Sequence, residues 1–84
     1  DVEDLAFKFV EIIKTNYSQN LSDRFKVESE TIKELKPLEI LELIGKKRGM
    51  LISGGGIDML RISNMLLEEF RNGKLGKITL EVIK

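Results

Sequence analysis

The stretch that decides the fold is IDMLRISNMLLEEFRNG, residues 57–73. Its apolar residues recur every three to four positions, which places them along one face of an α-helix. That inward face is expected to contain Ile62, Met65, Leu66 and Phe70. Asp58 is suited to cap the first helical N–H groups, and Asn72-Gly73 can adopt the left-handed conformation that ends a helix. This stretch therefore predicts an amphipathic helix with one face against a core.

Two further amphipathic helices are predicted upstream of this stretch. The first should cover about residues 2–18, with Val2, Leu5, Ala6, Phe9, Ile13 and Tyr17 at three-to-four spacing on one face. Pro37 is favoured at the first position of a helix because it has no N–H to lose, so it predicts a helix over residues 37–47. The inward residues there should be Leu38, Leu41 and Ile44, with Ile40 and Leu43 widening the stripe.

The connecting segments give weaker signals. Residues 21–27 can form a short helix with Ser22 as N-cap, whereas the polar residues 28–36 predict no element. Four glycines between Gly49 and Gly56 surround Met50-Leu51-Ile52, which predicts a loop whose apolar centre packs into the core.

The end of the chain alternates apolar and polar residues from Ile78 to Val82, a pattern typical of a strand. A single strand is not stable in water, so we expect an extended arm that packs on the helices or is partly disordered. Residues 1–84 are too few for two cores. The predicted fold class is all-α: one small compact bundle of three to four helices with an extended C-terminal arm.

The composition limits the class of protein and its cellular location. Apolar residues make up 42% and charged residues 33%, the balance of a folded globular domain. Cys is absent, which excludes disulfides and fits a cytoplasmic location. The apolar runs are too short to span a bilayer, so no membrane partner is expected. The chain begins at Asp1 without Met, and we expect it to be a domain excised from a longer protein.

Residues for catalysis are scarce. His and Cys are both absent, which removes the usual general bases, nucleophiles and most metal ligands. Two adjacent acidic pairs remain, Glu3-Asp4 and Glu68-Glu69. Neighbouring helical residues point in different directions, so these pairs should be solvated surface and not a catalytic or metal site.

The glycines also resemble part of a phosphate-binding loop. Gly49 and Gly54 have the required spacing, but Gly55-Gly56 stands where Lys and Ser or Thr must be. A tight connection between two helices is the simpler interpretation. Free N–H groups in such a loop can still hold an RNA phosphate, although Asp58 competes for those donors.

The charge is unevenly distributed although Lys and Arg balance Asp and Glu at fourteen each. Residues 46–77 contain seven basic residues against Asp58, Glu68 and Glu69. Several cations on one face are what phosphate binding needs. The basic set comprises Lys46, Lys47, Arg48, Arg61, Arg71, Lys74 and Lys77. On composition alone, a plain solvated surface is the simpler interpretation, because helix ends commonly collect cations.

Three motifs follow one another in the second half of the chain: IGKKRG (44–49), SGGGID (53–58) and FRNGKLGKITLE (70–81). In order and spacing they resemble the C-terminal domain of the YlqF/RbgA family, ribosome biogenesis GTPase A, a circularly permuted GTPase. The resemblance covers about residues 38–81. It implies a helical domain similar to the ANTAR-type RNA-binding fold, which follows the GTPase domain and binds 23S rRNA in a late precursor of the large (50S) subunit.

This resemblance also implies which residues and partners matter. The rRNA-binding residues carried over by the motifs are Lys46, Lys47, Arg48, Arg71, Lys74 and Lys77, and Arg61 is weaker because it lies between motifs. GTP and Mg²⁺ would bind the upstream domain, so this chain alone is expected to hold no cofactor and not to be an enzyme. Expected partners are large-subunit rRNA, ribosomal proteins and the chain's own GTPase domain.

A protein interaction domain is the alternative function. It would pack on its GTPase domain or on a ribosomal protein through Met50 to Ile52 and the C-terminal arm. An apolar interface should hardly respond to salt, whereas binding to RNA should weaken steeply as salt rises.

Overall fold

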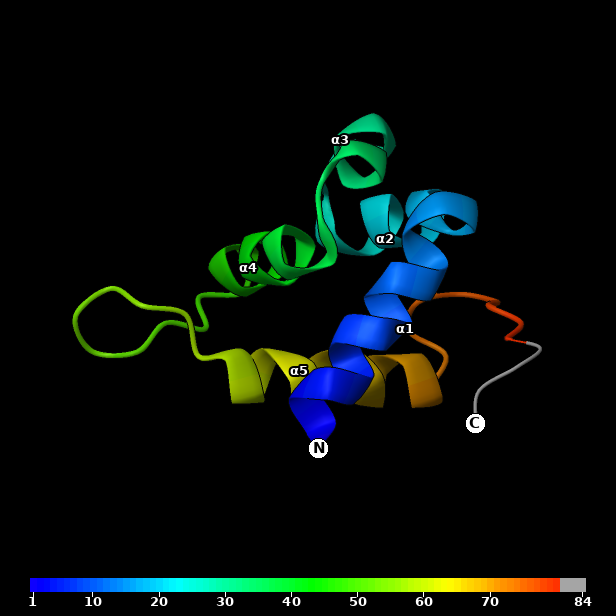
Figure 1. Cartoon of the computed structure of the whole chain (residues 1–84). Coiled ribbons are helices and arrows are strands. Elements are labelled where there is room, and N and C mark those ends of the chain that lie inside the picture. Colours follow the sequence, from blue (N-terminus) through cyan, green and yellow to red (C-terminus); the bar gives the residue numbers. More distant parts are fainter. Residues whose placement is uncertain (81–84) are drawn as a thin grey trace.

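The computed structural model describes residues 1–80, and all regular elements in that part are helices. They are α1 (Val2–Asn16), α2 (Ser18–Phe25), α3 (Ser29–Glu34), α4 (Pro37–Lys47) and α5 (Met59–Arg71) (Figure 1). The predicted all-α class is confirmed. None of these helices has the length and apolar composition needed to cross a membrane.

Helix α5 forms as its sequence predicts. The Asp58 carboxylate accepts a hydrogen bond from the Arg61 N–H at 3.2 Å and caps the first turn. The helix stops at Asn72, and Gly73 follows with φ +76°, a conformation open to glycine without strain. Ile62 and Leu66 are fully buried, and the neighbouring Leu67 is buried as well.

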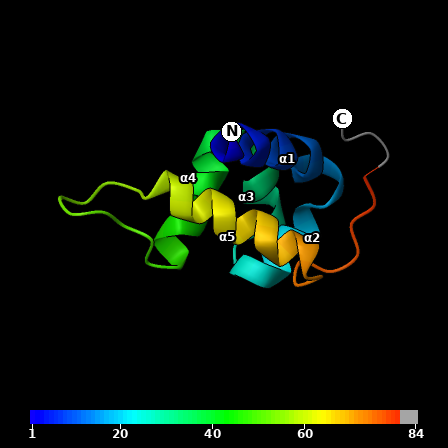
Figure 2. The same cartoon turned by 90° about the horizontal axis from the view of Figure 1, so that it is seen from below.

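The core lies where α1 crosses α5 and packs against α4, with the pair α2 and α3 at one end (Figures 1 and 2). The Phe9 and Phe70 rings fix the crossing of α1 and α5, with centroids 4.7 Å apart and planes tilted by 46°. The buried apolar residues are Ala6, Phe9, Val10, Ile13, Leu21, Phe25, Ile32, Ile40, Leu41, Ile44, Ile62, Leu66, Leu67 and Leu75. Every helix contributes at least one of them.

Gly45 explains how α4 comes so close to α5. It is buried in the last turn of α4, and a methyl group at this position would overlap the Ile62 side chain on α5. Glycine is unfavourable inside a helix by about 1 kcal/mol relative to alanine. The close approach of the two backbones offsets that cost.

The first half of the chain corrects several predictions. Helix α1 ends at Asn16, two residues earlier than predicted, and Leu5 on it is 48% exposed. Helix α2 begins at Ser18 and not near Ser22, so the predicted N-cap is wrong. Leu38 on α4 is also 48% exposed, because Ile40 and Leu41 take the inward positions of that turn.

Helix α3 was not predicted, and its sequence, SETIKE, is mostly polar. Ile32 is its one buried residue, at 2% exposure, and α3 packs against α2 and α1. Six residues are too few for a stable isolated helix. The short helix therefore depends on its contacts with its neighbours, which local sequence patterns do not reveal.

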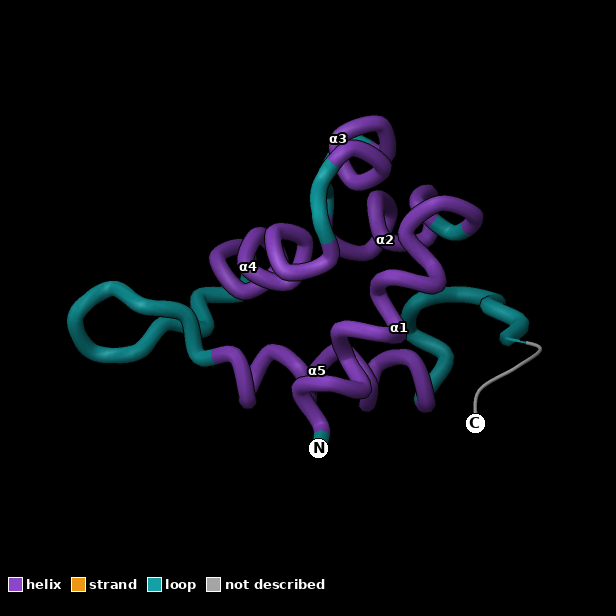
Figure 3. Tube along the Cα trace, in the orientation of Figure 1, coloured by secondary structure: helices purple, strands orange, loops and turns teal. Residues whose placement is uncertain are grey.

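The segment between α4 and α5 is a hairpin that extends away from the helices (Figures 1 and 3). Leu51 and Ile57 form an isolated antiparallel bridge, and the Ile52 N–H donates to the Gly56 carbonyl at 2.9 Å. The predicted packing of its apolar centre into the core holds for Met50, which is partly buried against the core, and is wrong for Leu51 and Ile52, which are 49% and 51% exposed. We call residues 50–58 the hairpin below.

After α5 the chain runs back along α2 and the end of α1 as an extended arm (Figure 3). Leu75 is buried, and its carbonyl accepts a hydrogen bond from Asn20 Nδ2 at 2.9 Å. The Tyr17 hydroxyl donates to the Thr79 carbonyl at 3.1 Å and accepts from the Thr79 N–H at 3.2 Å. The packed arm is thus confirmed as far as Leu80. The rest of the predicted strand, Glu81 and Val82, lies outside the described residues.

Candidate nucleic-acid interface

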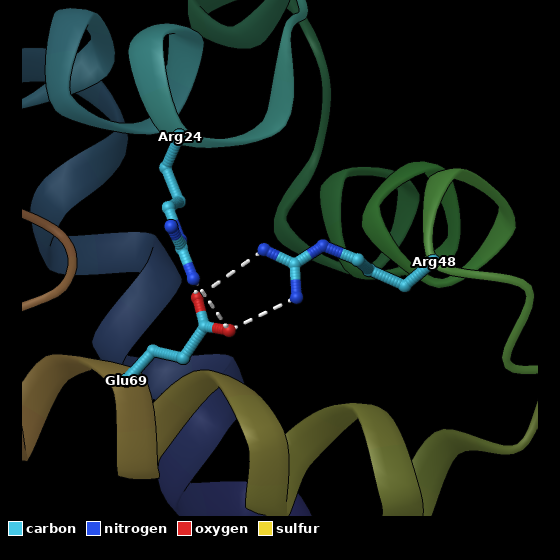
Figure 4. A network of polar contacts seen from close by, with 3 residues as sticks. All are labelled: Arg24, Arg48 and Glu69. Atoms are coloured by element: carbon cyan, nitrogen blue, oxygen red, sulfur yellow. Dashed lines mark hydrogen bonds and ion pairs between the residues drawn. The ribbon is translucent and has the colours of Figure 1, made fainter.

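One carboxylate binds two arginines from different parts of the chain (Figure 4). Glu69 on α5 accepts hydrogen bonds from Arg24 Nε at 2.9 Å and Arg24 Nη2 at 3.3 Å. It also accepts one from Arg48 Nη1 at 2.9 Å. Arg24 lies on α2 and Arg48 just after α4, so the cluster joins three segments that are distant in sequence. We call these three residues the arginine–glutamate cluster.

The electrostatics of the cluster favour the ionised carboxylate. Burial alone raises the pKa of Glu69, but the hydrogen bonds and positive charges of Arg24 and Arg48 outweigh it and hold the pKa below its ordinary value. The same hydrogen bond to Glu69 raises the pKa of Arg24. Glu69 is 8% exposed, so the prediction that it belongs to the solvated surface is wrong.

Arg48 therefore differs from the other predicted RNA-binding residues. Its guanidinium donates to Glu69 and also lies over the Phe25 ring, with Cζ 4.9 Å from the ring centroid. Its side chain is only 30% exposed. The structure thus places Arg48 in contacts that hold the fold together.

Arg48 as a whole residue is exposed, and so are the remaining five predicted residues: Lys46, Lys47, Arg71, Lys74 and Lys77. Within residues 1–80, none of the five forms an ion pair with an acidic side chain. Arg61, the weaker candidate, is exposed as well. In the described part of the chain, these cations are exposed to solvent and unpaired, as contact with a polyanion requires.

These five cations form two groups and not one cluster. Lys46 and Lys47 end α4 near the start of α5, because the hairpin returns there and the Asp58 N–H donates to the Met50 carbonyl at 3.0 Å. The other three lie at or beyond the end of α5. Thirteen helical residues rise about 20 Å, which sets the approximate separation of the groups. Figures 1 and 2 both show the hairpin and the arm at opposite ends of α5.

Arg24 was not predicted to be near any site. Its position in the sequence, among polar residues of a short helix, carries no signal of a contact with Glu69 forty-five residues away. The fold also brings Arg24 next to Lys74 at the wall of a shallow pocket. Only tertiary structure shows this proximity.

The geometry agrees with the rejection of the phosphate-binding loop. Gly54 to Gly56 belong to the hairpin with its antiparallel bridge, and Gly49 directly precedes it, so these glycines do not form a turn between a parallel strand and a helix. In the described part of the chain, no group of three or more acidic side chains is arranged to hold a metal ion.

The fold and its surface together define a class: a small all-helical domain with exposed cations at both ends of one helix. Comparisons with known proteins then identify the family. The chain is 35% identical over 81 residues to ribosome biogenesis GTPase A of Bacillus cereus, covering 96% of the chain and 26% of that protein. Ribosome biogenesis GTPase A of Bacillus licheniformis is 30% identical over 81 residues, covering 96% and 28%.

The chain belongs to the same family as these proteins and corresponds to their C-terminal part. An uncharacterized GTP-binding protein of Methanocaldococcus jannaschii is also similar, at 29% identity over 79 residues, covering 94% of the chain and 20% of that protein. The chain spans about a quarter of the length of the curated relatives that it matches. No protein-family model matches it, and no solved structure is significantly similar.

Proposed function

We propose that this chain is the rRNA-binding domain of a cytoplasmic ribosome biogenesis GTPase that acts in late assembly of the large subunit. Its relatives are named ribosome biogenesis GTPase A, and their similarity to the chain covers 96% of the chain's length. The domain would anchor the GTPase on precursor rRNA through two groups of exposed cations, with the helices as scaffold. GTP and Mg²⁺ would bind an upstream domain of the parent protein.

The single observation that carries this proposal is the exposure of five cations without acidic partners in residues 1–80. The acidic residues of the same half offer little opposition. Glu69 is bound by two arginines and Asp58 caps α5, so Glu68 is the one acidic residue of residues 46–77 that faces solvent without such a contact in the described part of the chain. Exposed cations that release counterions from phosphates supply most of the affinity in sequence-independent binding of nucleic acids. Two groups about 20 Å apart would contact phosphates several nucleotides apart.

The first test is the double variant Lys46→Ala/Lys47→Ala, with Arg48 left intact because its removal would disturb Glu69. We expect binding to large-subunit rRNA to weaken about tenfold at physiological salt, since two phosphate contacts are lost. Fluorescence anisotropy with a labelled rRNA fragment measures the dissociation constant.

The matched control is Lys8→Ala/Lys14→Ala, which removes the same charge from α1, a helix that carries neither cation group. We expect its affinity to stay within about twofold of the parent chain because long-range charge is screened at this salt concentration. Equal losses in the two variants would show that total charge matters and the assigned positions do not.

One observation favours the alternative, a protein interaction domain. Leu51 and Ile52 lie half exposed on a hairpin that extends from the helices (Figure 1). An exposed apolar pair suits a contact with the GTPase domain or a ribosomal protein. That contact should hardly change between 50 and 200 mM salt, whereas RNA binding should weaken strongly over the same range.

A further inference from the structure

A pocket of about 340 Å³ lies between α2 and the start of the arm. It is lined by Asn20, Asp23, Arg24, Lys74, Leu75 and Gly76. The pocket belongs to the end of the molecule that carries three of the five exposed cations, so an RNA held by those cations would pass close to it. The third sequence motif contains one wall, Lys74 to Gly76, but no motif contains the α2 wall, because the two walls lie about fifty positions apart in the sequence.

The walls are held in place by the fold. Arg24 is fixed by its two hydrogen bonds to Glu69, which leave its Nη1 group outside that pair. The Lys74 N–H donates to the Glu69 carbonyl at 2.9 Å, which fixes the backbone that carries the lysine. The Arg24 guanidinium, which Glu69 already holds, therefore loses less entropy when a ligand binds than a free side chain would.

Gly76 lies in the arm wall of the pocket. Its φ of +81° favours glycine, and a Cβ there would lie 3.0 Å from Asn20 Nδ2. The Asn20 amide itself donates to the Leu75 carbonyl and holds the arm against α2. Together these contacts set the distance between the α2 wall and the arm wall.

The lining combines a carboxylate with cationic donors. Asp23 accepts one hydrogen bond from Gln19 Nε2 at 2.8 Å, and an ionised carboxylate has capacity for several more. A phosphate would be repelled by Asp23. An unpaired base instead presents donors and acceptors on the same ring system, and proteins recognise such bases along their edges.

Guanine matches this lining better than the other bases do. It offers two adjacent donors, N1–H and the 2-amino group, to a carboxylate, and two acceptors, O6 and N7, to Lys or Arg. Adenine and uracil lack the paired donors. We propose that this pocket binds an unpaired guanine of RNA, with Asp23 accepting from N1–H and the amino group and Lys74 and Arg24 donating to the acceptor edge. The inference rests on the proposed RNA-binding function.

The test compares short single-stranded RNAs, UUGUU against UUAUU, by fluorescence anisotropy with the 84-residue chain at low salt. We expect the guanine-containing RNA to bind about tenfold tighter. In the variant Asp23→Asn this preference should disappear, while binding of UUAUU stays equal or strengthens because a negative charge is lost. The matched control Asp4→Asn removes the same charge from α1 and should keep the preference.

The possible outcomes distinguish failure of the guanine pocket from failure of the proposed RNA-binding function. If the unaltered chain binds both RNAs and large-subunit rRNA without preferring guanine, or if Asp23→Asn keeps the preference, the guanine pocket is refuted and the RNA-binding proposal stands. If the chain binds neither the short RNAs nor large-subunit rRNA, the proposed function fails and the pocket inference fails with it.

Discussion

Glu69 is the residue whose removal should most disturb the tertiary structure outside the apolar core. Its carboxylate, 10% exposed as a side chain, joins α2, α5 and the end of α4 through Arg24 and Arg48. Glu69→Gln keeps the shape but removes the charge that both arginines need. We expect the free energy of unfolding to fall by about 1–2 kcal/mol, less than for a fully buried pair because both arginines are partly exposed to water. Urea unfolding monitored by circular dichroism measures this at pH 7.

The same residue predicts a pH dependence. The pKa of Glu69 is lower in the folded chain than its ordinary value of about 4.5. The folded state therefore binds fewer protons, and the stabilisation is complete above the ordinary pKa and is lost as pH falls through the folded pKa. The stability difference between the parent chain and Glu69→Gln should shrink as the pH is lowered from 6 to 3. A difference that stays constant over that range would show that the charge of Glu69 contributes nothing.

At the scale of elements, substitutions in the arm should lower the free energy of unfolding much more than substitutions in the hairpin. Leu75→Ala removes a side chain that is 2% exposed and should cost about 2–4 kcal/mol of unfolding free energy. Leu51→Ser/Ile52→Ser alters two half-exposed side chains on the hairpin and should change stability by less than about 1 kcal/mol. Thermal or urea unfolding of both variants checks this. A larger loss in the hairpin variant would mean that the Leu51 and Ile52 side chains pack on the helices.

Elements with strong local signals were predictable, and those made by distant contacts were not. Helix α4 covers Pro37–Lys47 as predicted, because proline marks its start and the apolar spacing continues to its end. Helix α3 escaped prediction because Ile32 is its one buried residue and its stability comes from α1 and α2. The outward position of Leu51 and Ile52 also escaped, since apolar residues between glycines are expected to be buried.

At the scale of the whole molecule, sequence reasoning identified the family and the basic half but could not arrange the cations. Their division into two groups depends on the path of the hairpin and the length of α5. The engagement of Arg48 by Glu69 depends on how α4 packs on α5. Both are tertiary facts. The exposed set that remains, Lys46, Lys47, Arg71, Lys74 and Lys77, is still the prediction for the RNA contact.

The most direct measurement of the central claim is the salt dependence of binding between this chain and large-subunit rRNA. Five phosphate contacts predict a slope of roughly −3.5 to −4.5 in a plot of log association constant against log salt concentration. Lys46→Ala/Lys47→Ala should make the slope less steep by about 1.4–1.8. A slope near zero, or an unchanged slope in the double variant, would contradict the account that exposed cations at the two ends of α5 hold the RNA.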